Sequence, residues 1–195
     1  MNALLHAAVP AAAGYLLGSI PVADLVARRG AVDLRRVGDG NPGYWNARAS
    51  FGRRAALPVL VGDIAKGAAA AAVGRFAAAS GDWRPPVVAT GAAMAGHAWP
   101  VFAGFRGGRA VATFIGGALV LSPRAGAVAT AGGCVVGAAA GSFPRGVHAG
   151  FVAYPLAQLV VDGRVRTAAT GALMTFIGLR FLTARRPDPA SGDAA

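Results

Sequence analysis

One histidine, two arginines and a pair of glycines stand between apolar stretches in residues 96–113, GHAWPVFAGFRGGRAVAT. Pro100 follows His97 closely and should end the helix that carries the histidine, because proline lacks the N–H that a helix interior needs. Near neutral pH a histidine can act as a general base or as a neutral hydrogen-bond partner. His97 is therefore a candidate for acid–base chemistry, with a buried structural histidine as the alternative.

The turn that follows contains the residue types of an anion site. Gly107 and Gly108 can adopt positive φ, which would let the chain reverse before the next helix. Amides at the start of that helix, together with Arg109 and Thr113, would then form a phosphate site. An ordinary reverse turn is the alternative. The chain has no G-x-x-x-x-G-K-[ST] motif, so the turn does not predict a nucleotide-binding fold.

The polar segment 33–54, DLRRVGDGNPGYWNARASFGRR, is a second candidate anion site. Asn41 and Asn46 supply amides. Arg35 and Arg48 supply guanidinium groups, which bind phosphate through parallel hydrogen bonds. A loop that only carries positive charge for membrane orientation is the alternative. Such a loop needs arginine but has no use for paired asparagines, and this favours phosphate binding.

Asp63 and Lys66, in GDIAKG, stand three residues apart within an apolar segment. On a helix that spacing puts both side chains on one face. Ionisable residues inside a membrane span are costly and usually face a polar cavity or a partner. Asp63 would orient Lys66 towards an anion near the membrane surface. An ion pair that only holds two helices together is the alternative.

The composition indicates that a polytopic membrane protein positions these residues. Of the 195 residues, 55% are hydrophobic and 14% are charged, whereas a soluble domain is normally about 25% charged. The many alanines and glycines suit closely packed transmembrane helices. The net charge of +11 lies mainly in short loops, which favours lipid headgroups or phosphorylated substrates over nucleic acid as partners. The single Cys134 excludes an internal disulfide and a cysteine metal cluster.

Seven apolar segments predict an all-α protein with about seven transmembrane helices. They are 4–26, 56–74, 86–105, 110–122, 125–143, 147–161 and 167–183. A full crossing needs about 20 helical residues, so 110–122 and 147–161 are predicted to be tilted or re-entrant. Residues 1–183 are expected to form one membrane domain, and the polar residues 184–195 a disordered cytoplasmic tail.

The arginines predict the orientation of the chain in the membrane. With the N-terminus outside, thirteen arginines fall in the inner loops and tail, and five fall in the outer loops. Inner loops of membrane proteins carry the excess of positive charge. We therefore expect the N-terminus outside, the C-terminus inside, and the candidate site segments at the cytoplasmic face.

Three stretches, in this order and spacing, resemble the bacterial acyl-phosphate:glycerol-3-phosphate acyltransferases. They are LLGSIPVADLVARRGAVDLRRVGDGNPGYWNARASFG, DIAKG and GHAWPVFAGFRGGRAVATFIG, and they lie within roughly residues 15–117. The family's motifs are G-S-I-P, D-[IL]-R and G-S-G-N-x-G-A-T-N-x-x-R, then D-x-x-K-G, then G-H-x-x-P-x-F-x-x-F-x-G-G-K-G-V-A-T. The resemblance implies a seven-span fold in the bacterial cytoplasmic membrane, with the active site facing the cytoplasm.

The resemblance also implies a reaction and the residues that perform it. An acyl phosphate would acylate the first hydroxyl of glycerol 3-phosphate, giving lysophosphatidate in phospholipid biosynthesis, with no cofactor and no metal. The implied catalytic residues are His97, Lys66 and Arg109. The implied phosphate-binding residues are Ser19, Arg35, Asn41, Asn46, Arg48, Gly107, Gly108 and Thr113.

The chain departs from the family's pattern at several positions. The motif serine is Asp39, the motif lysine is Arg109, and the motif Ala-Thr is Tyr44-Trp45. The end of the chain, GLRFLTARRPDPASGD, lacks the family's R-H-x-x-N-I-x-R-L-x-x-G-x-E, and the chain contains no glutamate. One alternative is thus a catalytically degenerate paralogue that binds an anionic lipid or a phosphorylated ligand. A small transporter is the other, suggested by the Asp63–Lys66 pair alone.

Overall fold

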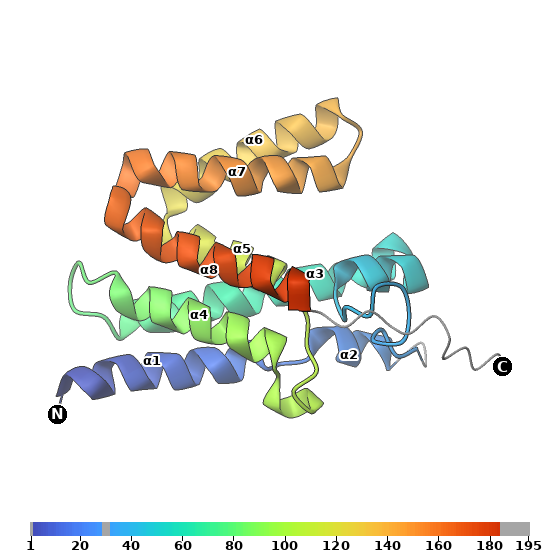
Figure 1. Cartoon of the computed structure of the whole chain (residues 1–195), viewed down its shortest axis with the longest axis horizontal. Coiled ribbons are helices and arrows are strands. Elements are labelled where there is room, and N and C mark those ends of the chain that lie inside the picture. The colour runs from blue at the N-terminus through green and yellow to red at the C-terminus, as the bar shows by residue number, and fades with distance from the viewer. Residues whose placement is uncertain (1, 29–31, 184–195) are drawn as a thin grey trace.

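The computed structural model describes residues 2–28 and 32–183, which form eight α-helices and one short 3₁₀-helix, without a β-strand in these two ranges (Figure 1). The helices are α1 (Asn2–Gly18), α2 (Val22–Ala27), α3 (Tyr44–Phe76), α4 (Arg84–Ala98), η1 (Val101–Ala103), α5 (Val111–Leu121), α6 (Pro123–Ala139), α7 (Phe143–Asp162) and α8 (Arg164–Thr183). The all-α prediction is confirmed. The expected disordered tail, 184–195, lies outside the described residues.

Two predicted spans are longer than the helices that the chain forms. The segment 4–26 is not one helix, because α1 ends at Gly18 and α2 begins only at Val22. Pro21 stands at the N-cap of α2, where its missing N–H costs no helical hydrogen bond. The segment 86–105 is also interrupted, since α4 ends at Ala98, shortly before Pro100.

Two other segments form longer helices than the apolar pattern predicted. The segment 56–74 lies within the 33-residue α3, which bends at Gly52, where φ is 82°. The segment 147–161 lies within the 20-residue α7, which is long enough to cross a bilayer. By contrast, α5 has 11 residues and is about 16 Å long, so this segment is short, as predicted.

Small residues bring the helix backbones into close contact. A Cβ atom at Gly18 of α1 would overlap the backbone of Ala93 in α4, and one at Gly67 of α3 would overlap the backbone of Thr113 in α5. Gly133 packs in the same way between α6 and α7. Close backbone approach through small residues is typical of helices packed in membranes, and it explains the high alanine and glycine content.

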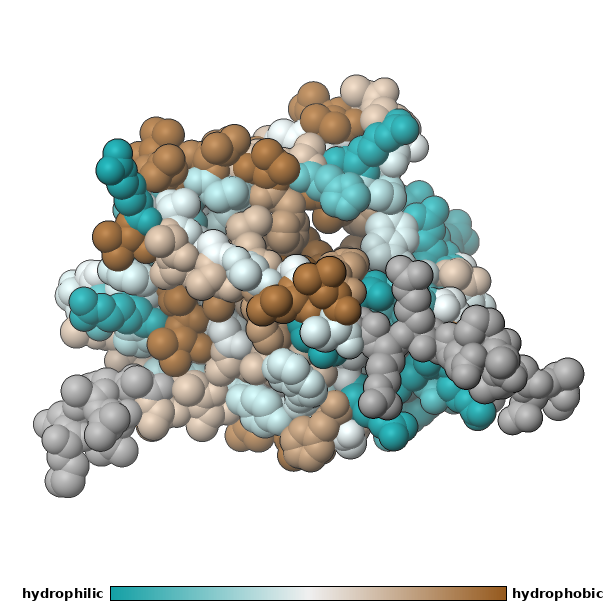
Figure 2. Space-filling model, viewed as in Figure 1, coloured by the Kyte–Doolittle hydropathy of each residue, from teal (hydrophilic) through white to brown (hydrophobic). Residues whose placement is uncertain are grey.

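The long helices lie side by side, so the connecting segments gather at two ends of the molecule (Figure 1). Residues 19–28 and 32–43, the turn 99–110 and the end of α8 lie at one end, and the segment 77–83 lies at the other. Figure 2 shows hydrophobic side chains gathered over the α6–α7 hairpin, where Leu156 and Val160 are 62% and 87% exposed. Two described stretches, Ala8–Ala27 and Tyr44–Phe76, are long and apolar enough to cross a membrane.

Candidate active site

A cationic cavity of about 800 Å³ lies at the end of the molecule where three segments meet. Residues 33–41 form one side, the turn 98–109 forms another, and the end of α8 closes the third. Its charged lining residues are Asp33, Arg35, Arg36, Asp39, Arg106, Arg109 and Arg180. We call this cavity the outer pocket. Its five cations outnumber its two carboxylates, which suits it to an anionic ligand.

Arg35 ties the loop 33–41 to α2 and to the turn 98–109. Its guanidinium donates two hydrogen bonds to the Asp24 carboxylate of α2, at 2.7 and 2.8 Å, and a third to the carbonyl of Arg106, at 2.8 Å. The hydrogen bonds with Asp24 raise the pKa of Arg35. Arg35 lines the outer pocket, but both terminal nitrogens of its guanidinium are bonded to Asp24, so it holds the walls in place.

The structure separates the three residues Asn41, Asn46 and Arg48. Asn41 lines the outer pocket. Asn46 is buried, and its amide donates to the carbonyls of Leu34 and Val37 at 3.3 and 2.8 Å, which fixes the fold of the loop. Arg48 is exposed and lies over the Trp45 ring, 5.6 Å from its centroid. It lines neither this pocket nor a smaller cavity beside Lys66 and His97.

A buried charge cluster forms the floor of the site. Lys66 Nζ lies 2.9 Å from Asp63 Oδ1, as the spacing in α3 predicted, and also donates to the carbonyl of Ile20 at 3.1 Å. His97 of α4 joins this pair, with Nδ1 3.5 Å from Asp63 Oδ1. All three side chains are less than a tenth exposed. A small cavity of about 20 Å³ lies beside them.

The turn 104–110 connects the floor to the outer pocket. Arg35, Gly107 and Gly108 line both cavities. The N–H groups of Gly107 and Gly108 donate to the carbonyls of Ala98 and His97, at 3.1 and 3.0 Å. These two amides are therefore used to hold the turn against the end of α4.

Glycine is needed at position 108 for a reason other than the predicted one. Positive φ values occur at Gly104, Phe105 and Ala110, each near 60°, and not at Gly107 or Gly108. A Cβ at Gly108 would instead overlap His97 Nε2 and come within 3.0 Å of Asn41 Oδ1. The imidazole nitrogen thus lies against the bare backbone of Gly108, a residue that lines both the small cavity and the outer pocket.

Ser19 and Thr113 lie inside the helix packing. Both are fully buried, and neither hydroxyl has a hydrogen-bond partner within the described part of the chain. Neither residue lines the outer pocket or the small cavity. Ser19 follows α1 directly, and Thr113 lies in the first turn of α5.

Two features of the outer pocket were missed at the sequence level. Arg180 of α8, which counted only towards orientation, lies over the Trp99 ring, 5.0 Å from the centroid, with its guanidinium 3.4 Å from the carbonyl of Gly108. Arg109 forms an ion pair with Asp39 and covers the Phe181 ring. The sequence offered one signal for this pair. At position 39 a negatively charged residue replaces the motif serine, and at position 109 a positively charged residue replaces the motif lysine.

The fold and the site together define a class of protein, an all-helical bundle with a cationic pocket above a buried Asp–Lys–His cluster. The sequence model of the family described as glycerol-3-phosphate acyltransferase matches residues 8–186. This match covers most of the chain, and the chain belongs to the glycerol-3-phosphate acyltransferase family.

Curated relatives and solved structures agree with this family. A glycerol-3-phosphate acyltransferase of Rubrobacter xylanophilus is 45% identical over 113 residues, which cover 58% of this chain and 56% of the relative. One from Exiguobacterium sibiricum is 48% identical over 111 residues, covering 56% and 52%. The chain thus spans little more than half the length of the curated relatives it matches.

The likeness in three dimensions extends over nearly the whole chain. The crystal structure of PlsY (YgiH), an integral membrane glycerol 3-phosphate acyltransferase in its glycerol 3-phosphate form, matches with a TM-score of 0.78 and 26% identity, over 92% of this chain and 94% of that one. The lysophosphatidic acid form of PlsY matches with a TM-score of 0.75 and 24% identity, which concerns the fold alone.

Proposed function

We propose that this protein transfers an acyl group from an acyl phosphate to the first hydroxyl of glycerol 3-phosphate, giving lysophosphatidate and phosphate. The observation that carries the proposal is the outer pocket with its Asp63–Lys66–His97 floor, in a chain whose fold matches a glycerol 3-phosphate form of PlsY. Both substrates bear phosphate groups, and the pocket has cations on all its walls.

The reaction mainly requires that the enzyme position the two reactants and stabilise the charge that develops in the transition state. The hydroxyl oxygen attacks the carbonyl carbon, the new C–O ester bond forms, and the bond between the carbonyl carbon and the phosphate oxygen breaks. A mixed anhydride is already activated, so the step consumes no nucleotide. Holding two reactants in line and stabilising developing charge supply the rate enhancement.

Three side chains have separate roles in this mechanism. Arg109 contributes positive charge to the departing phosphate from the wall of the outer pocket. Lys66 supplies a fixed positive charge at the floor. His97 is the candidate acceptor for the hydroxyl proton, because Asp63 lies on its Nδ1 side and Nε2 lies beside Gly108, which lines the outer pocket.

We further propose that α1 and α3 to α8 cross the cytoplasmic membrane of a bacterium seven times, with the short α5 crossing where the bilayer is locally thinned. The outer pocket then faces the cytoplasm. The arginine distribution supports this orientation, because most arginines lie at the end of the bundle that carries the pocket.

The orientation is tested with single cysteines in a Cys134→Ala background, since Cys134 is exposed. A membrane-impermeant thiol reagent added to intact cells should label Ser80→Cys and spare Trp45→Cys. The reverse pattern contradicts the orientation.

The proposed reaction is tested by incubating the purified protein with palmitoyl phosphate and glycerol 3-phosphate and measuring lysophosphatidate. We expect turnover by the wild type and its loss in Arg109→Ala. A second candidate function is that of a non-catalytic binder, favoured by Asp39, which occupies Arg109 with an internal carboxylate. Thermal stabilisation by glycerol 3-phosphate without any lysophosphatidate would replace the acyltransferase proposal with this binder.

A further inference from the structure

The ion pair between Asp39 and Arg109 crosses the outer pocket from one wall to the other. Asp39 belongs to the loop 33–41, and Arg109 belongs to the turn before α5. The Arg109 side chain is 14% exposed and is backed by the Phe181 ring, whereas Asp39 is 44% exposed. The arginine is therefore held in the wall, and the carboxylate is the more accessible partner.

The backbone around Asp39 allows its side chain to leave Arg109. Gly38 and Gly40 flank it, with φ values of 58° and 70°. Glycine restricts backbone torsions least of all residues. The other Asp39 oxygen accepts a hydrogen bond from the N–H of Asn41 at 3.2 Å, a local contact that holds Asp39 within its own loop. Removal of Asp39 from Arg109 thus breaks one ion pair and requires no helix to move.

An anion that enters the pocket has to compete with Asp39 for the same guanidinium. A carboxylate carries one negative charge, and a phosphate monoester carries close to two near neutral pH. The phosphate also brings three acceptor oxygens against the carboxylate's two, and it can use Arg180, which lines the same pocket. Arg109 therefore pairs with phosphate when phosphate is bound, and with the Asp39 carboxylate after phosphate has left.

We propose that Asp39 is a displaceable internal counter-ion of Arg109, which phosphate anions replace when they bind and which returns to Arg109 when phosphate leaves. The proposal rests on the proposed function for the identity of the anions. The presence of aspartate at position 39, where the family motif has serine, then has a specific consequence. Asp39 weakens substrate binding and speeds the release of the product phosphate.

Binding of inorganic phosphate to the full chain, purified in an uncharged detergent, tests the proposal by titration calorimetry at low salt. Asp39→Asn should tighten phosphate binding about tenfold, by removing the competing charge. Asp33→Asn is the matched control, because Asp33 lines the same pocket with 48% exposure but lies beside Arg35. It should change the affinity less than about threefold, since a charge beside Arg35 does not occupy Arg109.

The effect should also depend on Arg109. In an Arg109→Ala background, the further change Asp39→Asn should alter phosphate affinity less than about threefold, because the shared partner is gone. Asp39→Ser should reproduce Asp39→Asn, so that a folding defect in one variant does not decide the result. Weaker or unchanged phosphate binding in both Asp39 variants overturns the proposal, as does an equal gain in Asp33→Asn.

The same titrations with glycerol 3-phosphate separate this proposal from the acyltransferase function. Suppose that phosphate binding follows the expected pattern, but the wild type neither binds nor acylates glycerol 3-phosphate. The counter-ion then stands and the proposed function falls. If the wild type acylates glycerol 3-phosphate while Asp39→Asn leaves phosphate affinity unchanged, the function stands and the counter-ion falls.

Discussion

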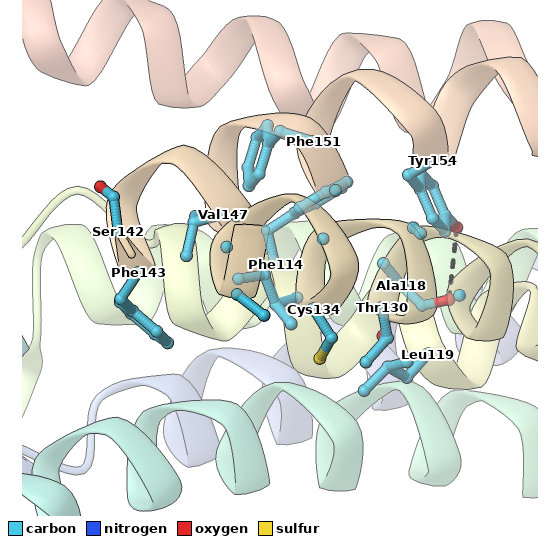
Figure 3. Close-up of a pocket in the computed structure, with 18 of the residues that line it drawn as sticks. Phe114, Ala118, Leu119, Thr130, Cys134, Ser142, Phe143, Val147, Phe151 and Tyr154 are labelled. Carbon is cyan, nitrogen blue, oxygen red and sulfur yellow. Dashed lines mark hydrogen bonds between the residues drawn. The ribbon is translucent and has the colours of Figure 1, made fainter. Parts of the chain in front are cut away.

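The outer pocket and an apolar cavity between α5, α6 and α7 are built by opposite means. The outer pocket, about 800 Å³, lies between loops and helix ends and is lined by charged side chains. The apolar cavity, about 510 Å³, lies between α5, α6 and α7 and is lined by glycines, alanines and aromatic rings. Figure 3 shows Phe114, Phe151 and Tyr154 around it, with Cys134 and Thr130 from α6.

The difference concerns which kind of residue makes each cavity. Ion pairs and charge-assisted hydrogen bonds fix the outer pocket, as with Arg35 and Asp24, so a change of residue type there alters the chemistry. The apolar cavity depends on residues with small or no side chains. Gly133 and Gly146, for example, let the backbones of α6 and α7 approach closely, so a substitution there alters packing. Substitutions should therefore affect activity in the first region and stability in the second.

Lys66→Ala should have the largest effect, because it acts on both properties. Loss of the fixed positive charge that Lys66 supplies at the floor of the site should lower activity by about 10- to 150-fold. The substitution also leaves buried Asp63 without its partner at 2.9 Å, which should cost about 3–5 kcal/mol of unfolding free energy. Arg164→Ala, at the exposed start of α8, is the control and should behave as wild type in turnover and thermal unfolding assays.

A paired change separates the two effects of Lys66. Asp63→Asn with Lys66→Met removes both charges, so most of the lost stability should return while activity stays low. Recovery of both stability and activity would show that Lys66 only holds the helices together.

Gly108→Ala should lower activity with a smaller loss of stability. The new methyl group would displace the His97 imidazole, with which it overlaps at Nε2, and misplacement of a reacting group by about 1 Å can cost about 100-fold in rate. Gly132→Ala, in α6, is the matched glycine control, because nothing lies within 4 Å of the added atom. Equal turnover by the two variants would remove His97 from the reaction.

Tyr154→Phe should have the smallest effect and should act on stability alone. The Tyr154 hydroxyl donates to the carbonyl of Ala118 at 3.3 Å across the apolar cavity (Figure 3). That carbonyl also accepts the N–H of Ser122 at 3.0 Å, so it stays bonded, and the loss should be about 1 kcal/mol. Thermal unfolding should report it, with lysophosphatidate formation unchanged. A large fall in activity would mean that this region takes part in catalysis.

Several features followed from the sequence because they depend on neighbours along the chain. The seven apolar segments predicted an all-α protein, and Pro100 predicted the end of α4 near Ala98. The spacing of Asp63 and Lys66 placed them on one face, and they form an ion pair. The break between α1 and α2 was missed although Pro21 marks it, because the apolar run continues through the proline.

Only the tertiary structure decided which polar residues share a site. It brought His97 to Asp63, paired Asp39 with Arg109 and placed Arg180 at the pocket. Arg48 points away although it stands in the same motif as Asn41. Helical periodicity fixes the relative direction of side chains within one helix. Contacts between segments also depend on how each helix is rotated and how closely small residues let its neighbours approach, and those are properties of the packed molecule.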